Sequence, residues 1–409
     1  MLATLTRLLG DMSTAEDAVQ EAFVEALRTW PLRGVPSRPG AWIMTTARNR
    51  ALDRVRRDAR RPAKESAATL LASHRGPSGS PGEGAAERGG DPTGELSPVA
   101  DDQLRMIFTC CHPALAPAAQ VGLTLRMVCG LHVAEIARAF MQTEPTVYQR
   151  LVRAKAKIRT SNIPFRVPPA SLLRERVPPV LACIYLVFSE GYAASGGDDL
   201  IRHELCDEGI RLARLVVGLM PDEPEARGLL ALVLLQDSRR SARLGPAGEL
   251  VLLEDQDRAW WDRRRIAEGR AELDRALQDG RPGPYSVQAA IAATHAAAAT
   301  WAETDWPQIA ALYGALARLA PSPVVELNRA VAVAFAEGPA AGLAVVDAVA
   351  GDPRLARTHL LPATRADLLR RLGRRRQAAD AYRAALRLVG TSAERALLTR
   401  RLAEVTASA

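Results

Sequence analysis

Residues 131–159 carry two amphipathic helical patterns, separated by the short interruption MQTE. Apolar residues at helical spacing set one face of each pattern: Val133, Ile136, Ala137 and Phe140 in the first, and Val147, Leu151, Ala154 and Ile158 in the second. The opposite face of the second pattern carries Thr146, Gln149, Arg150, Arg153 and Lys157. Thr143 is expected to cap this second helix, whose first turn tolerates Pro145.

Two short helices at this spacing, the second of them basic, predict a helix-turn-helix whose second helix enters the major groove of DNA. The alternative is an ordinary amphipathic pair whose charged residues face water, because such pairs show the same pattern. This stretch by itself favours neither interpretation, so the choice between them depends on the rest of the chain.

The composition favours an almost wholly helical chain. Hydrophobic residues make up 48% and aromatic residues 4% of the sequence, and β-branched runs are few. The length of 409 residues is enough for two or three domains. The net charge of +8 permits an anionic partner without identifying one.

Five cysteines, an odd number, lie within helical patterns: Cys110, Cys111, Cys129, Cys183 and Cys206. Such a set fits a reducing interior better than a disulfide framework. Zinc binding by the first three with His112 and His132 is disfavoured, because adjacent cysteines in an apolar helix cannot easily reach one tetrahedral ion and no CxxC repeat follows. Free cysteines of this kind are usually buried, so we expect no metal and no other cofactor.

Several motifs of other protein classes are missing from the sequence. It shows no signal peptide and no apolar run of membrane-spanning length, so we expect a cytoplasmic protein that does not contact membranes. It also shows no Gly-rich phosphate loop, no HExxH motif and no Ser or Cys paired with a suitable base. His203 beside Glu204 is interpreted as an exposed helical pair. The sequence therefore predicts a protein that is not an enzyme.

The N-terminal residues are expected to form short helices. After a first helix over 1–9, Ser13 and Glu16 have the spacing of a capping box that would start a second helix near Ala15. The core side of this helix is expected to hold Val19, Phe23, Ala26 and Trp30, and the water side Asp17, Gln20, Glu21 and Glu25. A loop is predicted over 31–40, which is rich in proline and glycine.

A third helix begins near Trp42 and is crowded with basic residues. Its polar positions are Arg48, Asn49, Arg50, Arg54, Arg56, Arg57, Arg60 and Arg61. Guanidinium groups at this density repel one another unless an anion neutralises them, and phosphates do this well. Trp42 has two interpretations, either as core packing or as a surface on which unpaired bases stack.

Changes in composition divide the chain into four parts. Residues 1–61 and 101–160 are predicted to form two small helical domains, the second containing the helix-turn-helix. Residues 62–100 are rich in Gly, Pro, Ser and Glu and predict a flexible linker. Residues 161–409 form a helical extension, with helices expected over 172–190, 200–220, 223–237 and 256–277.

Late in the extension, small and aromatic residues recur about thirty-four residues apart, around Gly314, Gly342 and Tyr382. This spacing is typical of tetratricopeptide repeats, whose stacked helix pairs leave a concave surface that binds proteins or peptides. A solenoid of this type can also act only as a spacer, because a fold alone does not assign a function.

The order of these features resembles the extracytoplasmic-function group of bacterial RNA polymerase sigma factors, and within it the subset with a long tetratricopeptide-like C-terminal extension. The stretches that carry the resemblance are EDAVQEAFVEAL, RPGAWIMTTARNRALDRVRR, DDQLRMIFTCCHPAL and EIARAF with TVYQRLVRAKAKIR, and in the extension YLVFSEGY, LCDEGIRLARLV and ELVLLEDQDR. Together they cover nearly the whole chain.

The resemblance implies a role for each part. Residues 1–61 correspond to sigma region 2 and residues 101–160 to sigma region 4. Asp17, Gln20 and Glu21 would dock on the polymerase core, and the loop 31–40 would capture a flipped base of the −10 element. The melted −10 strand would lie beside Trp42, Arg48, Asn49, Arg50 and Arg54, and the −35 element would be read by Thr146, Gln149, Arg150 and Arg153, with Lys157 on the same face. The implied partners are RNA polymerase core, promoter DNA and a protein or peptide on the C-terminal helical surface.

The sequence departs from this family in two places. Family members generally have a longer first helix, so the chain is expected to begin late. Pro145 occupies a position where the family prefers a small residue, so the −35 preference is expected to differ. The competing hypotheses are a helix-turn-helix regulator that binds operators without polymerase, with a repeat domain as its sensor, and a scaffold protein whose basic helices only face water.

Overall fold

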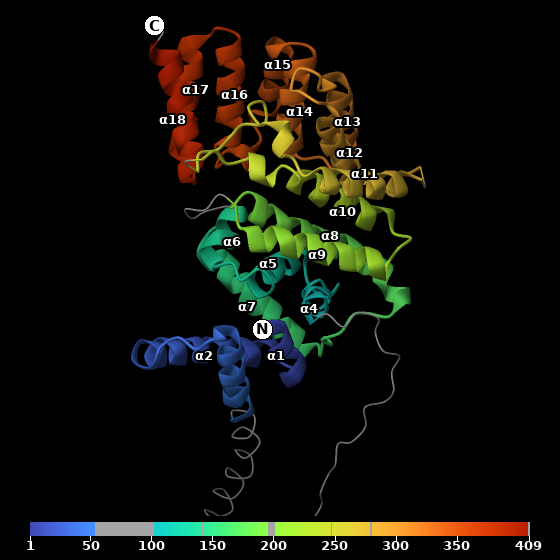
Figure 1. Ribbon diagram of the computed structural model, residues 1–409, viewed down its shortest axis with the longest axis vertical. Helices are drawn as coiled ribbons and strands as arrows, with labels where there is room; N and C mark the ends of the chain where they lie inside the picture. The colour runs from blue at the N-terminus through green and yellow to red at the C-terminus, as the bar shows by residue number, and fades with distance from the viewer. Residues whose placement is uncertain (54–101, 141, 195–200, 247, 279, 408–409) are drawn as a thin grey trace, which may run out of the picture. The chain divides into compact units, whose positions relative to one another are not determined.

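The computed structural model describes residues 1–53, 102–140, 142–194, 201–246, 248–278 and 280–407 (Figure 1). Its regular elements in these ranges are helices, with one isolated antiparallel bridge between Leu244 and Leu250. The prediction of an all-α chain is therefore confirmed. The linker predicted over 62–100 lies outside the described residues.

The α-helices are α1 (Leu2–Leu9), α2 (Met12–Arg33), α4 (Asp102–Cys110), α5 (Pro117–Met127), α6 (Val133–Ala139), α7 (Glu144–Thr160), α8 (Ala170–Tyr192), α9 (His203–Leu219), α10 (Pro224–Asp237), α11 (Arg263–Leu277), α12 (Pro284–Ala297), α13 (Trp306–Leu319), α14 (Pro323–Ala336), α15 (Pro339–Val349), α16 (Leu360–Arg371), α17 (Arg375–Leu388) and α18 (Ser392–Ala407). A further helix is described over 39–53. Three 3-10 turns are η1 (Arg240–Ala242), η2 (Arg258–Trp260) and η3 (Pro353–Leu355). Within the part of the chain that the structure describes, no helix is both long and apolar enough to cross a membrane.

Contacts divide the chain into two compact units. One comprises Met1–Val128 and Leu151–Arg174, and the other comprises Cys129–Arg150 and Glu175–Ala409.

The N-terminal helices pack around small residues of α2. Buried alanines at helical spacing line one side of this helix: Ala15, Ala18, Ala22 and Ala26. Their core is completed by Leu5 of α1 and by Ile43, Ala47 and Ala51 of helix 39–53. Small side chains at such contacts let helix axes approach closely. The prediction that Phe23 faces the core is wrong, because Ala22 occupies the inward position and Phe23 lies 49% exposed.

The start and end of α2 also differ from the prediction. The Asp11 carboxylate accepts a hydrogen bond from the Thr14 N–H at 2.6 Å, so the helix begins at Met12 and the predicted capping box does not start it. The helix then continues through Pro31 to Arg33. The following loop is therefore shorter than 31–40, and the next helix begins at position 39.

Glu16, the second residue of the predicted capping box, has another role. Its carboxylate pairs with Arg126 of α5, at 3.4 Å between Oε1 and Nη2, and with Lys155 of α7. All three side chains are largely shielded from solvent. These pairs fix α2 to α5 and α7 within the first compact unit.

All five cysteines are buried and none forms a disulfide bond. Burial raises the pKa of the Cys129 thiol far above its usual range and that of Cys206 to about 11. Because the thiolate is the reactive form, both side chains behave as small core residues.

In the second unit, α10 is buried along almost its whole length and supports α12. A Cβ on Gly228 would lie 2.4 Å from the Ser286 hydroxyl oxygen, so only glycine allows this approach. Glu225 of α10 accepts hydrogen bonds from the N–H groups of Tyr285 at 2.9 Å and Ser286 at 3.0 Å, and from the Ser286 hydroxyl at 2.8 Å. The start of α12 is therefore capped by a residue of α10, because Gly283 before it has no side chain to do so.

Asp237 closes α10 with a buried charge cluster. Its side chain is 0% exposed, and its Oδ1 accepts a hydrogen bond from Nε of Arg240 at 2.6 Å. Arg265 of α11 pairs with the other carboxylate oxygen. This carboxylate therefore joins α10, η1 and α11.

The predicted helix over 256–277 is wrong at its start. Asp262 accepts hydrogen bonds from the N–H groups of Arg264 at 2.9 Å and Arg265 at 3.0 Å, so α11 begins at Arg263. The residues before it form the short turn η2, which Asp257 caps. The helices predicted over 172–190, 200–220 and 223–237 exist with ends that differ by at most a few residues.

The last helices, from α13 to α18, pack as successive neighbours (Figure 1). Tyr382 is buried in their core together with Ala378 and Ala385 of the same helix. A Cβ on Gly342 would lie 2.6 Å from the Ala330 carbonyl oxygen, so α14 and α15 also approach closely. A Cβ on Gly314 would meet only the end of the Arg318 side chain, at 4.0 Å, so no such close approach occurs there. The tetratricopeptide assignment stays a prediction.

Candidate nucleic-acid interface

The side of α2 that points away from its alanine core is partly acidic and partly apolar. We call it the α2 outer face, and it consists of Asp17, Gln20, Glu21, Phe23, Val24 and Leu27, all of them exposed. Leu27 is 77% exposed, and Leu32, near the end of the helix, is 86% exposed. Contiguous apolar groups left in water commonly mark a surface that another macromolecule covers.

The sequence interpretation found the polar half of this face and missed the apolar half. The sequence does contain a signal for the missed apolar half, because α2 carries alanines on one side and larger apolar residues on the other. When alanines form the buried side, the larger apolar side chains are left for another partner.

Helix 39–53 places its predicted residues unevenly. Arg48 and Asn49 are exposed, whereas Trp42 is half-buried and meets Trp30 edge-on, with ring centres 5.6 Å apart. Trp42 is therefore part of the core packing, and only its outer part is accessible. Arg54 lies outside the described residues.

Arg50 reaches back to α2. Its guanidinium lies 2.8 Å from the Glu25 carboxylate and 3.9 Å from that of Glu21. Pairs this exposed contribute at most about 1 kcal/mol, so a phosphate group can compete for the same guanidinium.

The second helix of the helix-turn-helix, α7, has the two faces that the periodicity predicts. Val147, Leu151, Ala154 and Ile158 are buried. Thr146, Gln149, Arg153 and Lys157 are exposed. Thr143 directly precedes the helix, and its hydroxyl oxygen lies 2.8 Å from that of Thr146. Pro145 occupies the first turn, where its missing N–H has no intrahelical partner to lose.

Arg150 is the exception among the predicted α7 residues. Its guanidinium carbon lies 5.6 Å from the centre of the Phe140 ring, and its Nη1 is buried with no hydrogen-bond partner. The expectation that it stands on the free face beside Gln149 is therefore wrong. Phe140 directly follows α6, so the Arg150 side chain lies against the first helix of the pair.

The exposed cations of α7 are not neutralised by neighbours. Among the described residues, no carboxylate pairs with Arg153, Lys157 or Arg159, whereas Lys155 is held by Glu16. Free cations on an exposed helix suit contact with phosphate groups.

Known proteins match this arrangement region by region. Sigma-70 region 2 matches residues 1–61, sigma-70 region 4 matches residues 105–158, and a family of unknown function, DUF6596, matches residues 176–277. The uncharacterized protein R00370 of Rhizobium meliloti is 44% identical over 403 residues, which is 98% of this chain and 92% of that protein. The probable ECF RNA polymerase sigma factor SigI of Mycobacterium tuberculosis is 30% identical over 164 residues, which is 40% of this chain and 52% of that protein. No solved structure matches the chain. The chain belongs to the extracytoplasmic-function sigma factors that carry a C-terminal extension.

In this sigma factor, region 2 contains α1, α2 and helix 39–53, and region 4 contains α4 to α6 and most of α7. The α2 outer face lies in the first region and the free cations of α7 in or next to the second. The sigma factor family is non-enzymatic.

Sequence reasoning missed two exposed residues of the sigma factor's region 4, Tyr148 and Val152. Tyr148 is 61% exposed on α7, next to Gln149, and Val152 one turn later is also exposed. An exposed phenol and an apolar side chain suit contact with base edges and thymine methyl groups. The sequence signal for Tyr148 was its position directly after the buried Val147, because the helical period turns the next residue toward the outside of the helix.

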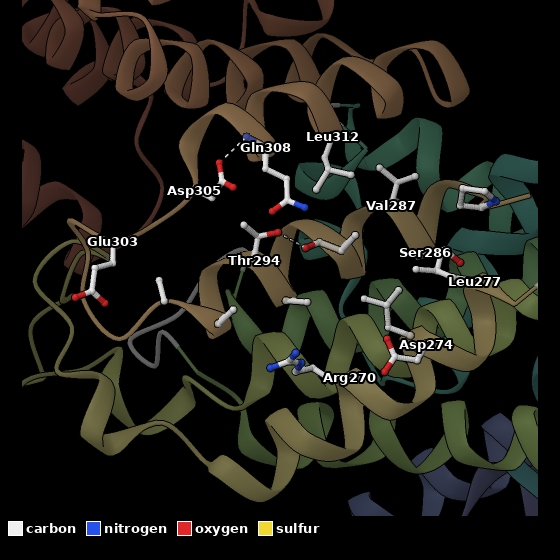
Figure 2. Close-up of a pocket in the computed structure, with 16 residues that line it drawn as sticks. Arg270, Asp274, Leu277, Ser286, Val287, Thr294, Glu303, Asp305, Gln308 and Leu312 are labelled. Carbon is white, nitrogen blue, oxygen red and sulfur yellow. Dashed lines mark hydrogen bonds between the residues drawn. The ribbon is translucent and has the colours of Figure 1, made fainter. Parts of the chain in front are cut away.

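The extension of the sigma factor contains an open groove of about 620 Å³ (Figure 2). Its floor is apolar and includes Leu277 of α11, Val287 of α12 and Leu312 of α13. Its polar rim has one cation, Arg270, and three carboxylates, Asp274, Glu303 and Asp305. All four charged side chains are exposed. The groove therefore combines an apolar floor with an excess of negative charge.

Proposed function

We propose that this sigma factor binds the core of RNA polymerase through the α2 outer face. We further propose that it directs the enzyme to promoters through helix 39–53 and α7. The observation that supports this best is the pairing of two different surfaces on the two sigma regions. One is acidic and apolar, which suits a protein partner, and the other carries free cations and an amide, which suit DNA. A scaffold protein whose basic helices only face water has no need for the second surface.

The contributions of the two DNA-contacting helices differ in kind. Opening a duplex costs about 1.4 kcal/mol of stacking per step, and phosphate contacts from Arg48 and Arg50 can offset part of this on one strand. Gln149 and Arg153 can form bidentate contacts with adenine and guanine, each worth about 1–3 kcal/mol of discrimination. Two weak contacts on one chain add through effective concentration only when their separation is fixed. We therefore expect weak binding to free promoter DNA and strong binding in the presence of core.

The proposal predicts promoter-specific transcription by bare core after addition of the full-length protein. The template is a library with randomised −35 and −10 sequences, and the readout is the sequences enriched in transcripts. Arg153→Ala should reduce enrichment at one −35 position about tenfold, because one base contact is lost. Arg383→Ala is the matched control, since Arg383 is an exposed arginine of α17 that pairs only with Asp380 among the described residues.

The same assay separates the competing hypothesis. A regulator that acts alone would protect a specific duplex from cleavage without any core enzyme, and its transcripts would not depend on the −10 sequence. That outcome would replace the sigma factor proposal with the helix-turn-helix regulator.

For the extension, we infer that the groove of Figure 2 binds a basic amphipathic helix of a protein partner. The apolar floor would take the apolar side of such a helix, and the carboxylates of Asp274 and Glu303 would face its cations. Anchors at helical spacing are the usual way in which a groove of this kind is filled.

A charge reversal tests this inference. The double change Asp274→Lys and Glu303→Lys is expected to weaken binding of a labelled helical Leu/Lys peptide at least about tenfold, measured by fluorescence anisotropy, since each exposed charge contributes up to about 1 kcal/mol. Asp222→Lys, an equally exposed carboxylate outside the groove, should change the affinity little. Equal losses in both proteins would show only a general charge effect.

A further inference from the structure

A second cavity, of about 300 Å³, lies in the extension and is separate from the groove. It is lined by residues of α8, α10, α12, α13 and α14, and by Arg239 and Leu253 from the segment between α10 and α11. Exposed Asn328 and Val324 mark its mouth, and half-buried Tyr185, His295 and Tyr313 lie further in. Its volume is at the lower end of the range found for small-molecule sites.

The charge of this cavity is opposite to that of the groove. Among the described residues, no Asp or Glu lines it, and Arg239 is its cation. No carboxylate pairs with Arg239 in the described part of the chain. Its nearest aromatic contact is Trp261, whose ring centre lies 5.8 Å from the guanidinium carbon.

The neighbouring arginines differ from Arg239 because their charge or hydrogen bonds are already used. Arg240 pairs with Asp237 and Asp207. Arg258 donates to the carbonyl oxygens of His295 at 2.7 Å and Ala298 at 2.6 Å. Arg239 is thus the guanidinium in this region that is left to meet a ligand.

The other polar groups of the cavity are neutral. Desolvation, together with Arg239 and Arg258, lowers the pKa of His295 to about 3, so its imidazole is uncharged near neutral pH. Desolvation raises the pKa of the Tyr313 phenol to about 12. The buried Nδ1 of His295 has no hydrogen-bond partner. The cavity therefore holds polar groups and one cation whose hydrogen-bonding capacity is not used within the protein, and a bound ligand can use it.

We propose that this cavity binds a small organic carboxylate, with the carboxylate on Arg239 and the apolar body against Ile291, Leu316 and Val325. Arginine binds a planar carboxylate through two parallel hydrogen bonds. The volume corresponds to about ten water molecules at their liquid density, so the ligand has roughly ten non-hydrogen atoms. A bare inorganic anion would leave the apolar wall unfilled. The inference goes beyond the proposed function, because it assigns a small-molecule site to the extension.

Thermal unfolding of the full-length protein tests the proposal, with benzoate as the probe. About 10 mM benzoate should raise the Tm by about 3–6 °C if this concentration is about ten times its Kd. Benzamide has the same shape without the charge, and inorganic phosphate has the charge without the apolar body. Neither should raise the Tm by more than a fraction of the benzoate shift.

Two variants locate the effect. Arg239→Gln removes the cation, and Val324→Trp fills the mouth of the cavity from an exposed position. Each should abolish the benzoate shift. An unchanged shift in both variants, an equal shift with benzamide or phosphate, or no shift at all would overturn the proposal. The assay contains neither polymerase nor DNA, so its failure leaves the proposed role in transcription untouched.

Discussion

Leu27→Asp is expected to weaken the binding of this sigma factor to polymerase core by about 100-fold. Leu27 is the most exposed apolar residue of the α2 outer face, and covering a leucine side chain at an interface contributes about 2 kcal/mol. An aspartate in its place would also bring an unpaired charge into the interface, which adds a further cost. Together these effects exceed the roughly 2.7 kcal/mol that a 100-fold change requires.

The measurement is a titration of labelled core with the wild-type and variant proteins. Leu360→Asp serves as the matched control, since Leu360 is an exposed leucine in the first turn of α16, where an acid suits the helix dipole. Circular dichroism should show equal helix content in all three proteins. Unchanged affinity in Leu27→Asp would show that the α2 outer face is not the docking surface.

Asp237→Ala is expected to lower the free energy of unfolding by about 3–5 kcal/mol. The fully buried carboxylate holds Arg240 and Arg265, and its removal leaves these guanidiniums only the exposed carboxylates of Asp207 and Asp262 as partners. Because this cluster joins α10, η1 and α11, the loss affects the second compact unit as a whole.

Denaturant unfolding monitored by circular dichroism measures this change. Asp380→Ala is the control, because Asp380 is 76% exposed and its pair with Arg383 at 2.8 Å is a surface pair. Such pairs contribute at most about 1 kcal/mol. Similar effects of the two substitutions would mean that the buried cluster adds no more than a surface pair.

Helical periodicity predicted the faces of α7 because the two sides differ strongly in polarity. It failed on α2, where the outward side also carries apolar residues and these are larger than the buried alanines. Apolar patterning favours Phe23 over Ala22 as the buried residue. The close approach of α1 and helix 39–53 instead requires the smaller alanine in the core. Arg150 shows another failure, since its partner Phe140 follows a different helix.

Helix starts were missed where a short acidic residue competes with the predicted signal. Asp11 and Asp262 each cap a helix that the sequence pattern began elsewhere. The cavity around Arg239 was not predictable in this way, because its lining comes from segments as far apart in sequence as α8 and α14. Local patterns contain no information about which side chains a fold brings together.

The capping of α12 by Glu225 has a consequence for where the extension can be divided. A fragment that begins after α10 would keep the whole of α12 and still lack the acceptor for its first N–H groups. Such a fragment would contain every residue of α12 but not the carboxylate that caps its N-terminus. Any excised extension must therefore retain Glu225, although the residue lies sixty positions before its hydrogen-bond partner Tyr285.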